Sequence, residues 1–544
     1  MERNLLKEKG VYQIYPISFK DSNNDGKGDI KGIISKLDYL ESIGIEIIWL
    51  SPIYLSPMLD MGYDVSDYKK INPIFGTMED FDSLMKETKE RHMKVIMDLV
   101  VNHTSSDHYW FKEALSNPKS KYRKYYYFRK GKNGEYPNNW TSTFTGPAWE
   151  KVEGEDDMYY LHIYSKYQPD LDFHSEELIQ EVESILSFWF EKGVYGFRCD
   201  VVSSFYKESL EDGKKTSIDK PIGLEHYIGV KKNQEILLRL RKNVVDKYNG
   251  VLIGEFSFAT TENVPPYIDN HILDTFFSFD HVNMNQIALF KKYVNPKVLK
   301  RTLIDWQSKV DNNGVYFENH DQNRVIGKYV KEKYQNKGSK LFLTLVYTLK
   351  GIPFIYQGQE LGAYNYPKGY MKFEETNDIC AKMIFESVKR IIPIKSLRKK
   401  FAMHISRDNE RAPMAFDSSE SFGFTSNWVK PWQKYNPLSV RANVQDEEKD
   451  EDSPLNFFKK LINIRKTNKI LSYGDISFYP TKGDVLLYVR EYEKKKILVQ
   501  ANLSSCNRNI SKDIKDFNIK DTLISNYSDI KEYLRPYEVI VSYL

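Results

Sequence analysis

The chain has 544 residues, of which 41% are hydrophobic and 28% are charged, the balance of a globular protein with a large core. Its formal net charge of +4 is small for this length and excludes the strongly basic surface of a nucleic-acid-binding protein. Residues 1–10 lack the apolar run of a signal peptide, and no apolar stretch approaches the ~20 residues of a membrane span. The three cysteines form neither a disulfide framework nor a metal-ligand pattern. We therefore expect a monomeric cytoplasmic protein with no membrane or nucleic-acid partner.

Short apolar runs alternate along the chain with amphipathic stretches that are typical of helices, such as 81–91, 177–192 and 234–247. Nearly continuous apolar strands joined by helical crossovers favour an α/β fold of the (β/α)8 TIM barrel type over an open sheet. The sixth strand is the weakest of the eight. The predicted strands are 11–19, 45–53, 94–102, 194–202, 251–258, 275–279, 315–320 and 352–357.

Two stretches interrupt this alternation. Residues 104–173 are rich in Tyr, Trp, Asn, Gly and Pro and are too long for an ordinary connection, which predicts an inserted subdomain B after strand 3. From residue 471 the pattern is strand-like again and predicts a C-terminal antiparallel β-domain over 471–544. The barrel would then consist of residues 1–103 and 174–470.

Three acidic residues each follow a strand-like apolar run. They are Asp200 in Gly-Phe-Arg-Cys-Asp, Glu255 in Ile-Gly-Glu-Phe, and Asp321 in Phe-Glu-Asn-His-Asp. A lone acid at a strand end is more simply a satisfied polar residue or a helix cap. Parallel strands of one barrel, however, open on the same rim, where such groups can converge. Paired carboxylates roughly 5–5.5 Å apart are what glycoside hydrolysis with retention requires.

The ordered set of motifs resembles the α-amylase superfamily of glycoside hydrolases (glycoside hydrolase family 13), and more closely its oligo-1,6-glucosidase and α-glucosidase branch. The similarity runs over nearly the whole chain. It includes Gln-Ile-Tyr-Pro at 13–16, Tyr-Gln-Gly-Gln-Glu at 356–360 and Ser-Arg-Asp-Asn-Glu-Arg-Ala-Pro-Met at 406–414.

The resemblance implies roles for the acidic residues. Asp200 would be the nucleophile, Glu255 the proton donor and later the base, and Asp321 a third carboxylate that binds ring hydroxyls. Arg198, two residues before Asp200 on the same strand face, would line the substrate site and keep Asp200 ionised by charge pairing. We expect apolar neighbours to raise the pKa of Glu255 so that it holds a proton near neutral pH.

The resemblance also implies a closed sugar pocket. His103 and His320 would hydrogen-bond to sugar hydroxyls, Asp60 and Tyr63 would close the far end, and Arg407 would bind the same terminal glucose. For Tyr63, simple packing in the core is an equally good interpretation. A closed pocket predicts exo-action on a non-reducing end.

One loop has the composition of a cation site. Its oxygen donors repeat at positions one, three, five, seven and nine, with Gly26 at six, as in the first part of an EF-hand. Position twelve is Gly32 and not Glu, so a sensor EF-hand is excluded. A plain Asx-rich turn is the other interpretation. The resemblance implies a structural Ca²⁺ here, although Mg²⁺ is also compatible. The ligands would be Asp21, Asn23, Asp25, Lys27 (through its carbonyl) and Asp29.

The linkage preference rests on Val201, because the resembled branch has Val after the nucleophile in α-1,6 enzymes and Ala or Thr in α-1,4 enzymes. We therefore predict a retaining exo-α-glucosidase that acts on short α-1,6-linked oligosaccharides. An α-1,4-glucosidase or sucrase-type α-glucosidase remains an alternative, since residues 168–173 and 413–416 depart from the family pattern on the aglycone side. A trehalose-6-phosphate hydrolase is a further alternative, because Lys291 and Lys292 could contact a phosphate. The three carboxylates disfavour a non-catalytic carbohydrate-binding scaffold.

Overall fold

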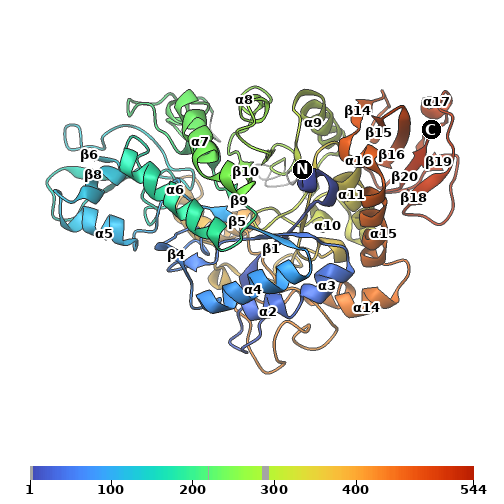
Figure 1. The fold of residues 1–544 in the computed structure, drawn as a ribbon, viewed down its shortest axis with the longest axis horizontal. Coiled ribbons are helices and arrows are strands. Elements are labelled where there is room, and N and C mark those ends of the chain that lie inside the picture. Colours follow the sequence, from blue (N-terminus) through green and yellow to red (C-terminus); the bar gives the residue numbers. More distant parts are fainter. Residues whose placement is uncertain (1–3, 218–219, 285–292) are drawn as a thin grey trace.

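The computed structural model describes residues 4–217, 220–284 and 293–544. Its centre is an eight-stranded parallel sheet in the order β11-β10-β9-β5-β2-β1-β13-β12 (Figure 1). A parallel bridge between Phe276 and Asn313 joins the two edge strands, so the sheet closes on itself. The strands are β1 (Val11–Ile14), β2 (Ile47–Leu50), β5 (Lys94–Leu99), β9 (Gly196–Cys199), β10 (Val251–Glu255), β11 (Thr275–Phe277), β12 (Gly314–Val315) and β13 (Ile352–Tyr356).

The predicted barrel is thus confirmed, with all eight strands in the expected places but shorter than expected. Large side chains fill its interior. Trp49 stacks on Phe277 with ring centroids 5.6 Å apart, and Phe277 meets Phe354 edge-on at 4.5 Å. All three are nearly fully buried. Because layered side chains fill such a barrel, its reactive groups must sit at the rim where the strands end.

Helices surround the barrel, and side-chain caps mark where several of them begin. The α4 helix (Met78–Glu90) starts with a capping box between Thr77 and Asp80. The Ser175 hydroxyl caps α6 (Glu176–Glu191), which buries its apolar face, including Trp189. The predicted third helix is α7 (Lys231–Asn243), and a separate 3-10 turn, η6 (Val245–Tyr248), follows it.

The stretch predicted as an insertion lies at one end of the molecule, opposite the C-terminal strands (Figure 1). It contains α5 (Tyr109–Ser116) and a three-stranded antiparallel sheet in the order β6-β8-β7. A bridge from His103 to Asp170 connects the two ends of this stretch, and a bridge from Tyr126 to Leu171 joins its interior to its C-terminal end. The three strands are β6 (Phe128–Lys130), β7 (Trp149–Lys151) and β8 (Met158–Leu161).

An antiparallel sheet in the order β14-β15-β16-β20-β18 forms the C-terminal part of the chain, as predicted. Arg490 in this sheet donates to the carbonyl oxygens of Thr348 (2.6 Å) and Leu349 (3.0 Å), which ties the sheet to the barrel. Within the described ranges, no helix is long and apolar enough to cross a membrane. The strands are β14 (Asp475–Phe478), β15 (Val485–Tyr492), β16 (Lys495–Asn502), β18 (Thr522–Ser525) and β20 (Val539–Tyr543).

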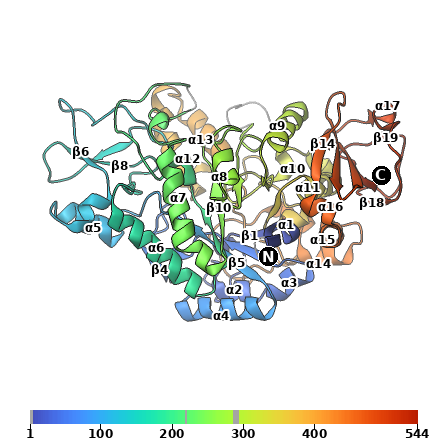
Figure 2. The ribbon, with the colours of Figure 1, turned by 45° about the horizontal axis from the view of Figure 1, so that its top comes forward.

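A long excursion leaves the barrel after β13. It contains two consecutive helices, α12 (Ile379–Ser387) and α13 (Lys395–Ile405), which lie next to each other (Figure 2). Asp378 immediately precedes α12, and Arg407 is the second residue after the end of α13. Arg407 hydrogen-bonds to Asp378 and to Asp321, so the two ends of this helical hairpin meet at the barrel rim.

Candidate active site

One arginine gathers carboxylates from three neighbouring strands. Arg198 on β9 is 1% exposed, and its Nη1 donates to Asp98 Oδ1 and to Asp200 Oδ1, both at 2.7 Å. Its Nη2 lies 2.5 Å from Glu255 Oε1. The planar guanidinium therefore binds Asp200 and Glu255 through its two terminal nitrogens, which brings the two carboxyl groups into direct proximity.

The pKa of Glu255 lies above that of Asp200, which is the order that a proton donor paired with a nucleophile requires. Burial raises the pKa of Asp200 to about 6, although the Arg198 charge acts in the opposite direction. Burial also raises the pKa of Glu255 to about 7, against Arg198, and the charges of Asp200 and Asp321 raise it further. The expected ion pair with Arg198 is present, but burial outweighs it at Asp200. Between these values Asp200 is ionised while Glu255 holds its proton.

The turn after Asp200 also contacts Glu255. The backbone N–H of Val201 donates to Glu255 Oε2 at 3.1 Å. Val201 has φ 38° and ψ 44°, a left-handed conformation that is unfavourable for a β-branched residue. Its side chain packs with Tyr164 and Tyr227 in an apolar cluster, and this packing holds the unfavourable turn in place.

Asp321 stands in a cationic environment and is the most accessible of the three acids, with its side chain 25% exposed. Its Oδ1 accepts from Arg411 Nη2 at 2.7 Å and from Arg407 Nη1 at 3.3 Å. Burial opposes its ionisation, but His320, Arg407 and Arg411 together hold its pKa well below the usual range. Asp321 is therefore a permanent charge near neutral pH and not a proton donor.

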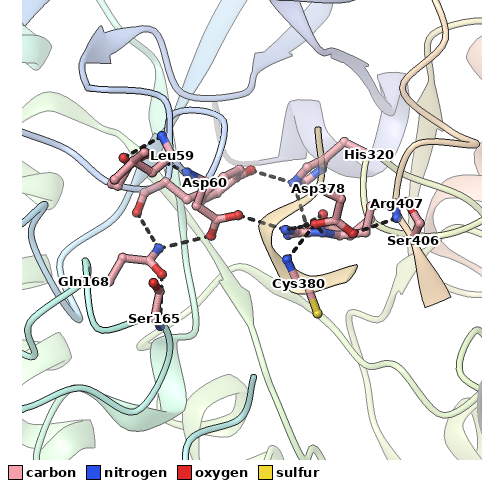
Figure 3. Close-up of polar contacts among 12 residues, drawn as sticks. Leu59, Asp60, Ser165, Gln168, His320, Asp378, Cys380, Ser406 and Arg407 are labelled. Atoms are coloured by element: carbon pink, nitrogen blue, oxygen red, sulfur yellow. Dashed lines mark hydrogen bonds and ion pairs between the residues drawn. The ribbon is translucent and has the colours of Figure 1, made fainter. Parts of the chain in front are cut away.

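Asp60 and Arg407 meet although 347 positions separate them (Figure 3). Arg407 Nη2 donates to Asp60 Oδ1 at 2.8 Å, and Gln168 Nε2 donates to Asp60 Oδ2 at 3.1 Å. Gln168 Nε2 also donates to the carbonyl oxygen of Tyr63 at 3.1 Å. These contacts join the loop after β2, the stretch after β5 and the segment after α13 into one wall.

The two histidines lie against Tyr63. The Tyr63 hydroxyl lies 2.7 Å from His320 Nε2, and His103 Nε2 lies 2.9 Å from the Tyr63 carbonyl oxygen. Gln13 Nε2 on β1 donates to His320 Nδ1 at 2.7 Å. Burial lowers the pKa of both histidines, while the charge of Asp170 raises that of His103 and the charge of Asp321 raises that of His320, and both rings can hydrogen-bond to hydroxyls. Tyr63 is buried and hydrogen-bonded, and its contact with a sugar stays a prediction.

A buried ion pair between Lys207 and Asp170 lies beside His103. Lys207 Nζ lies 2.5 Å from Asp170 Oδ2, and both side chains are fully buried. The same nitrogen donates to Asn102 Oδ1 at 3.0 Å and to the Ser204 carbonyl oxygen at 2.9 Å. This ammonium connects the end of β5, the stretch 104–173 and the turn after β9, and so fixes the surroundings of His103.

Five residues of this site were not predicted from the sequence: Gln13, Asp98, Gln168, Asp378 and Arg411. Four of them lie within strands or motifs that the sequence had already singled out, but their contacts arise only when distant strands come together. Asp378 lies in no motif, and its position before α12 was its only sequence signal.

The predicted cation loop is folded around its own carboxylates. Asp21 accepts from the backbone N–H groups of Asn23 (3.0 Å), Asn24 (2.7 Å) and Gly26 (2.8 Å), and Asp29 accepts from that of Gly32 (2.6 Å). An all-oxygen donor set of this kind fits a hard cation such as Ca²⁺. In the described part of the chain, no three His, Cys, Asp or Glu side chains lie together as a metal site. The Ca²⁺ therefore stays a prediction.

Comparisons with known proteins agree with this geometry. A family model described as the alpha amylase catalytic domain matches residues 13–474. The chain is 39% identical to an oligo-1,6-glucosidase of Bacillus cereus over 99% of both chains. It is 37% identical to a glucan 1,6-alpha-glucosidase of Streptococcus pneumoniae, covering 95% of this chain and 94% of that one.

Solved structures of similar proteins have the same fold. A trehalose-6-phosphate hydrolase of Bacillus licheniformis aligns with a TM-score of 0.90 and 35% identity over 99% of both chains. A trehalulose synthase of Pseudomonas mesoacidophila aligns with a TM-score of 0.91 and 33% identity, again over 99% of both chains. The strand-end carboxylates, the closed barrel and these full-length similarities lead to one conclusion: the chain belongs to the α-amylase family.

Proposed function

We propose that the protein is a retaining, exo-acting α-glucosidase that hydrolyses terminal α-1,6-linked glucose from short oligosaccharides. The observation that carries this proposal is the Arg198 guanidinium bound to both Asp200 and Glu255. In the first step the Asp200 carboxylate attacks C1, while Glu255 gives its proton to the departing glycosidic oxygen. In the second step Glu255 takes a proton from water, whose oxygen displaces Asp200 and releases glucose with retained configuration.

The exo mode follows from the wall made by Asp60, Gln168 and Arg407. These side chains hydrogen-bond to one another. We infer that they close the site behind one terminal sugar. Asp321, held ionised by the arginines, stabilises the positive charge that develops on the sugar ring in the transition state.

The α-1,6 preference is supported by Val201 and by the relatives named oligo-1,6-glucosidase and glucan 1,6-alpha-glucosidase. The other candidates are an α-1,4- or sucrase-type α-glucosidase and a trehalose-6-phosphate hydrolase, the name of one solved relative. Lys291 and Lys292, which suggested a phosphate contact, lie outside the described residues.

Rates on five sugars separate these candidates. We expect kcat/KM for isomaltose to exceed that for maltose, sucrose, trehalose and trehalose-6-phosphate. A methyl-scale difference such as Val201 discriminates by only about 1–3 kcal/mol, so a 10- to 200-fold preference is the expected size. Dominant hydrolysis of the phosphorylated sugar would refute the substrate assignment and leave the mechanism intact.

The pH dependence should report the two carboxyls. We expect kcat/KM for p-nitrophenyl α-glucoside to rise as Asp200 loses its proton near pH 6, and to fall as Glu255 loses its proton near pH 7. The expected result is a narrow bell with its maximum between these values. The Glu255→Gln variant cannot titrate at this position, so its profile should lack the alkaline limb. An alkaline limb that persists in this variant would contradict the assignment of Glu255.

We also propose that Ca²⁺ binds the loop at residues 21–29. Chelation with EDTA should then lower the melting temperature by a few degrees, since a ligand at a hundredfold excess over its Kd stabilises by about 2.7 kcal/mol. Added Ca²⁺ should restore the melting temperature, with Mg²⁺ as the comparison. The matched control is the Asp21→Asn, Asp25→Asn double variant, which should not respond to either treatment. Equal melting temperatures of the wild-type protein in EDTA and in Ca²⁺ would refute the site.

We propose a cytoplasmic location, supported by the sparse, unpaired cysteines, and a monomeric state. Light scattering of the purified protein and fractionation of the source cells test them directly.

A further inference from the structure

Asp378 is a buried carboxylate whose hydrogen bonds go almost entirely to one arginine (Figure 3). It accepts from Arg407 three times: from the backbone N at 3.0 Å, from Nε at 3.0 Å and from Nη2 at 2.6 Å. A fourth bond, from the Cys380 N–H at 3.0 Å, makes Asp378 the N-cap of α12. Asp378 is fully buried, and no substrate atom needs to reach it.

These bonds determine how the Arg407 guanidinium is oriented. Asp378 binds the edge formed by Nε and Nη2, and Nη2 is shared with Asp60 at 2.8 Å. The remaining terminal nitrogen, Nη1, is directed to Asp321 at 3.3 Å. A guanidinium held along one edge by a carboxylate cannot rotate, so its other N–H groups keep a fixed direction into the site.

The same contacts close the base of the hairpin formed by α12 and α13. Asp378 precedes the first helix and Arg407 follows the second. A separate set of bonds lies beside them, in which Asp408 Oδ2 accepts from the hydroxyls of Thr376 and Ser406. Asp408 thus provides a second buried carboxylate at the hairpin base, and its side-chain partners are hydroxyls.

We propose that Asp378 is a positioning residue for the closed end of the sugar pocket, which acts by holding Arg407 toward the sugar hydroxyls farthest from the bond that is cleaved. This inference rests on the proposed glucosidase function. A hexose whose C1 lies at Asp200 presents its C4 hydroxyl and C6 hydroxymethyl group to the far wall. Xylose has the same ring and the same C4 hydroxyl but lacks the C6 group, so the ratio of the two inhibition constants reports on contacts to C6.

The test measures inhibition constants of glucose and xylose against hydrolysis of p-nitrophenyl α-glucoside. Asp378→Asn keeps the size and the helix cap but removes the charge that binds Arg407. We expect the inhibition constant of glucose to rise at least about tenfold, that of xylose to rise much less, and KM to rise more than kcat falls. Asp408→Asn is the matched control and should leave the ratio of the two inhibition constants unchanged.

A double variant shows whether Asp378 acts through its arginine. Once Arg407 is replaced by Ala, adding Asp378→Asn should produce no further change in the ratio. If Asp378→Asn does not fold, Asp378→Ser repeats the test with another residue that caps helices well. An unchanged ratio, or equal weakening of both sugars, would overturn the positioning role. A wild-type protein that releases no p-nitrophenol would instead overturn the proposed function.

Discussion

Replacing Asp200 with Ala is expected to abolish nearly all hydrolysis, with kcat on any α-glucoside lowered by about 10⁴-fold or more, because the enzyme loses the carboxylate that attacks C1. Added sodium azide should restore part of the activity on p-nitrophenyl α-glucoside. Azide would enter the space left by the carboxylate and attack from the same face, so the product should be β-glucosyl azide. The rate of p-nitrophenol release and the configuration of the azide product are the measurements.

Asp98 offers a matched control for this experiment. It accepts from the same Arg198 nitrogen at the same distance of 2.7 Å, but it lies on the neighbouring strand and is fully buried. Asp98→Ala should slow hydrolysis by misplacing Arg198, and azide should not rescue it. Azide rescue of the Asp98 variant in place of the Asp200 variant would move the nucleophile assignment to β5.

The second large effect concerns the leaving group. With Glu255→Gln, we expect hydrolysis of isomaltose to fall by about 10²–10⁴-fold, since the departing sugar oxygen needs a proton. For 2,4-dinitrophenyl α-glucoside the formation of the glucosyl enzyme should be nearly unaffected, because that leaving group departs as an anion. The Gln side chain can still accept the Val201 N–H, so the geometry of the site is kept.

Azide again separates the roles. In the Glu255 variant azide should attack the glucosyl ester from the opposite face. The product should be α-glucosyl azide, the other anomer from that expected for the Asp200 variant. Equal losses of kcat/KM, which reports formation of the glucosyl enzyme, on isomaltose and on the dinitrophenyl substrate would contradict the role of Glu255 as proton donor. Release of β-glucosyl azide by this variant would contradict it as well.

The sequence predicted the barrel well because its strands are buried on both faces, and such strands are recognisable as short, continuous apolar runs. It placed all eight strands, but each strand ends earlier than predicted. The lengths were less predictable: β12 is only two residues long, because hydrogen-bond pairing in a closed barrel depends on the stagger of neighbours and not on the local run.

The charge balance of the site could not be predicted from residue types. Arg198 next to Asp200 in sequence suggested a lowered pKa, but the pKa of Asp200 is raised because complete burial is stronger than one shared guanidinium. The same arginine is divided among three carboxylates, and two of them come from strands that lie 100 and 57 positions away along the chain. How many carboxylates share the Arg198 charge depends on which strands are neighbours in the folded barrel, so it could not be predicted from the sequence.

The junction between β11 and β12 has little backbone pairing, because a single bridge from Phe276 to Asn313 joins these two short strands. By contrast, β2 and β5 pair over four residues on the other side of the wall. Resistance to local opening grows with the number of cooperative backbone bonds, so amide hydrogens along this narrow seam should exchange with deuterium before those of β2 and β5. Fluctuation of the wall would then start beside Phe277, whose ring lies in the packed interior against Trp49, and heat inactivation should begin there.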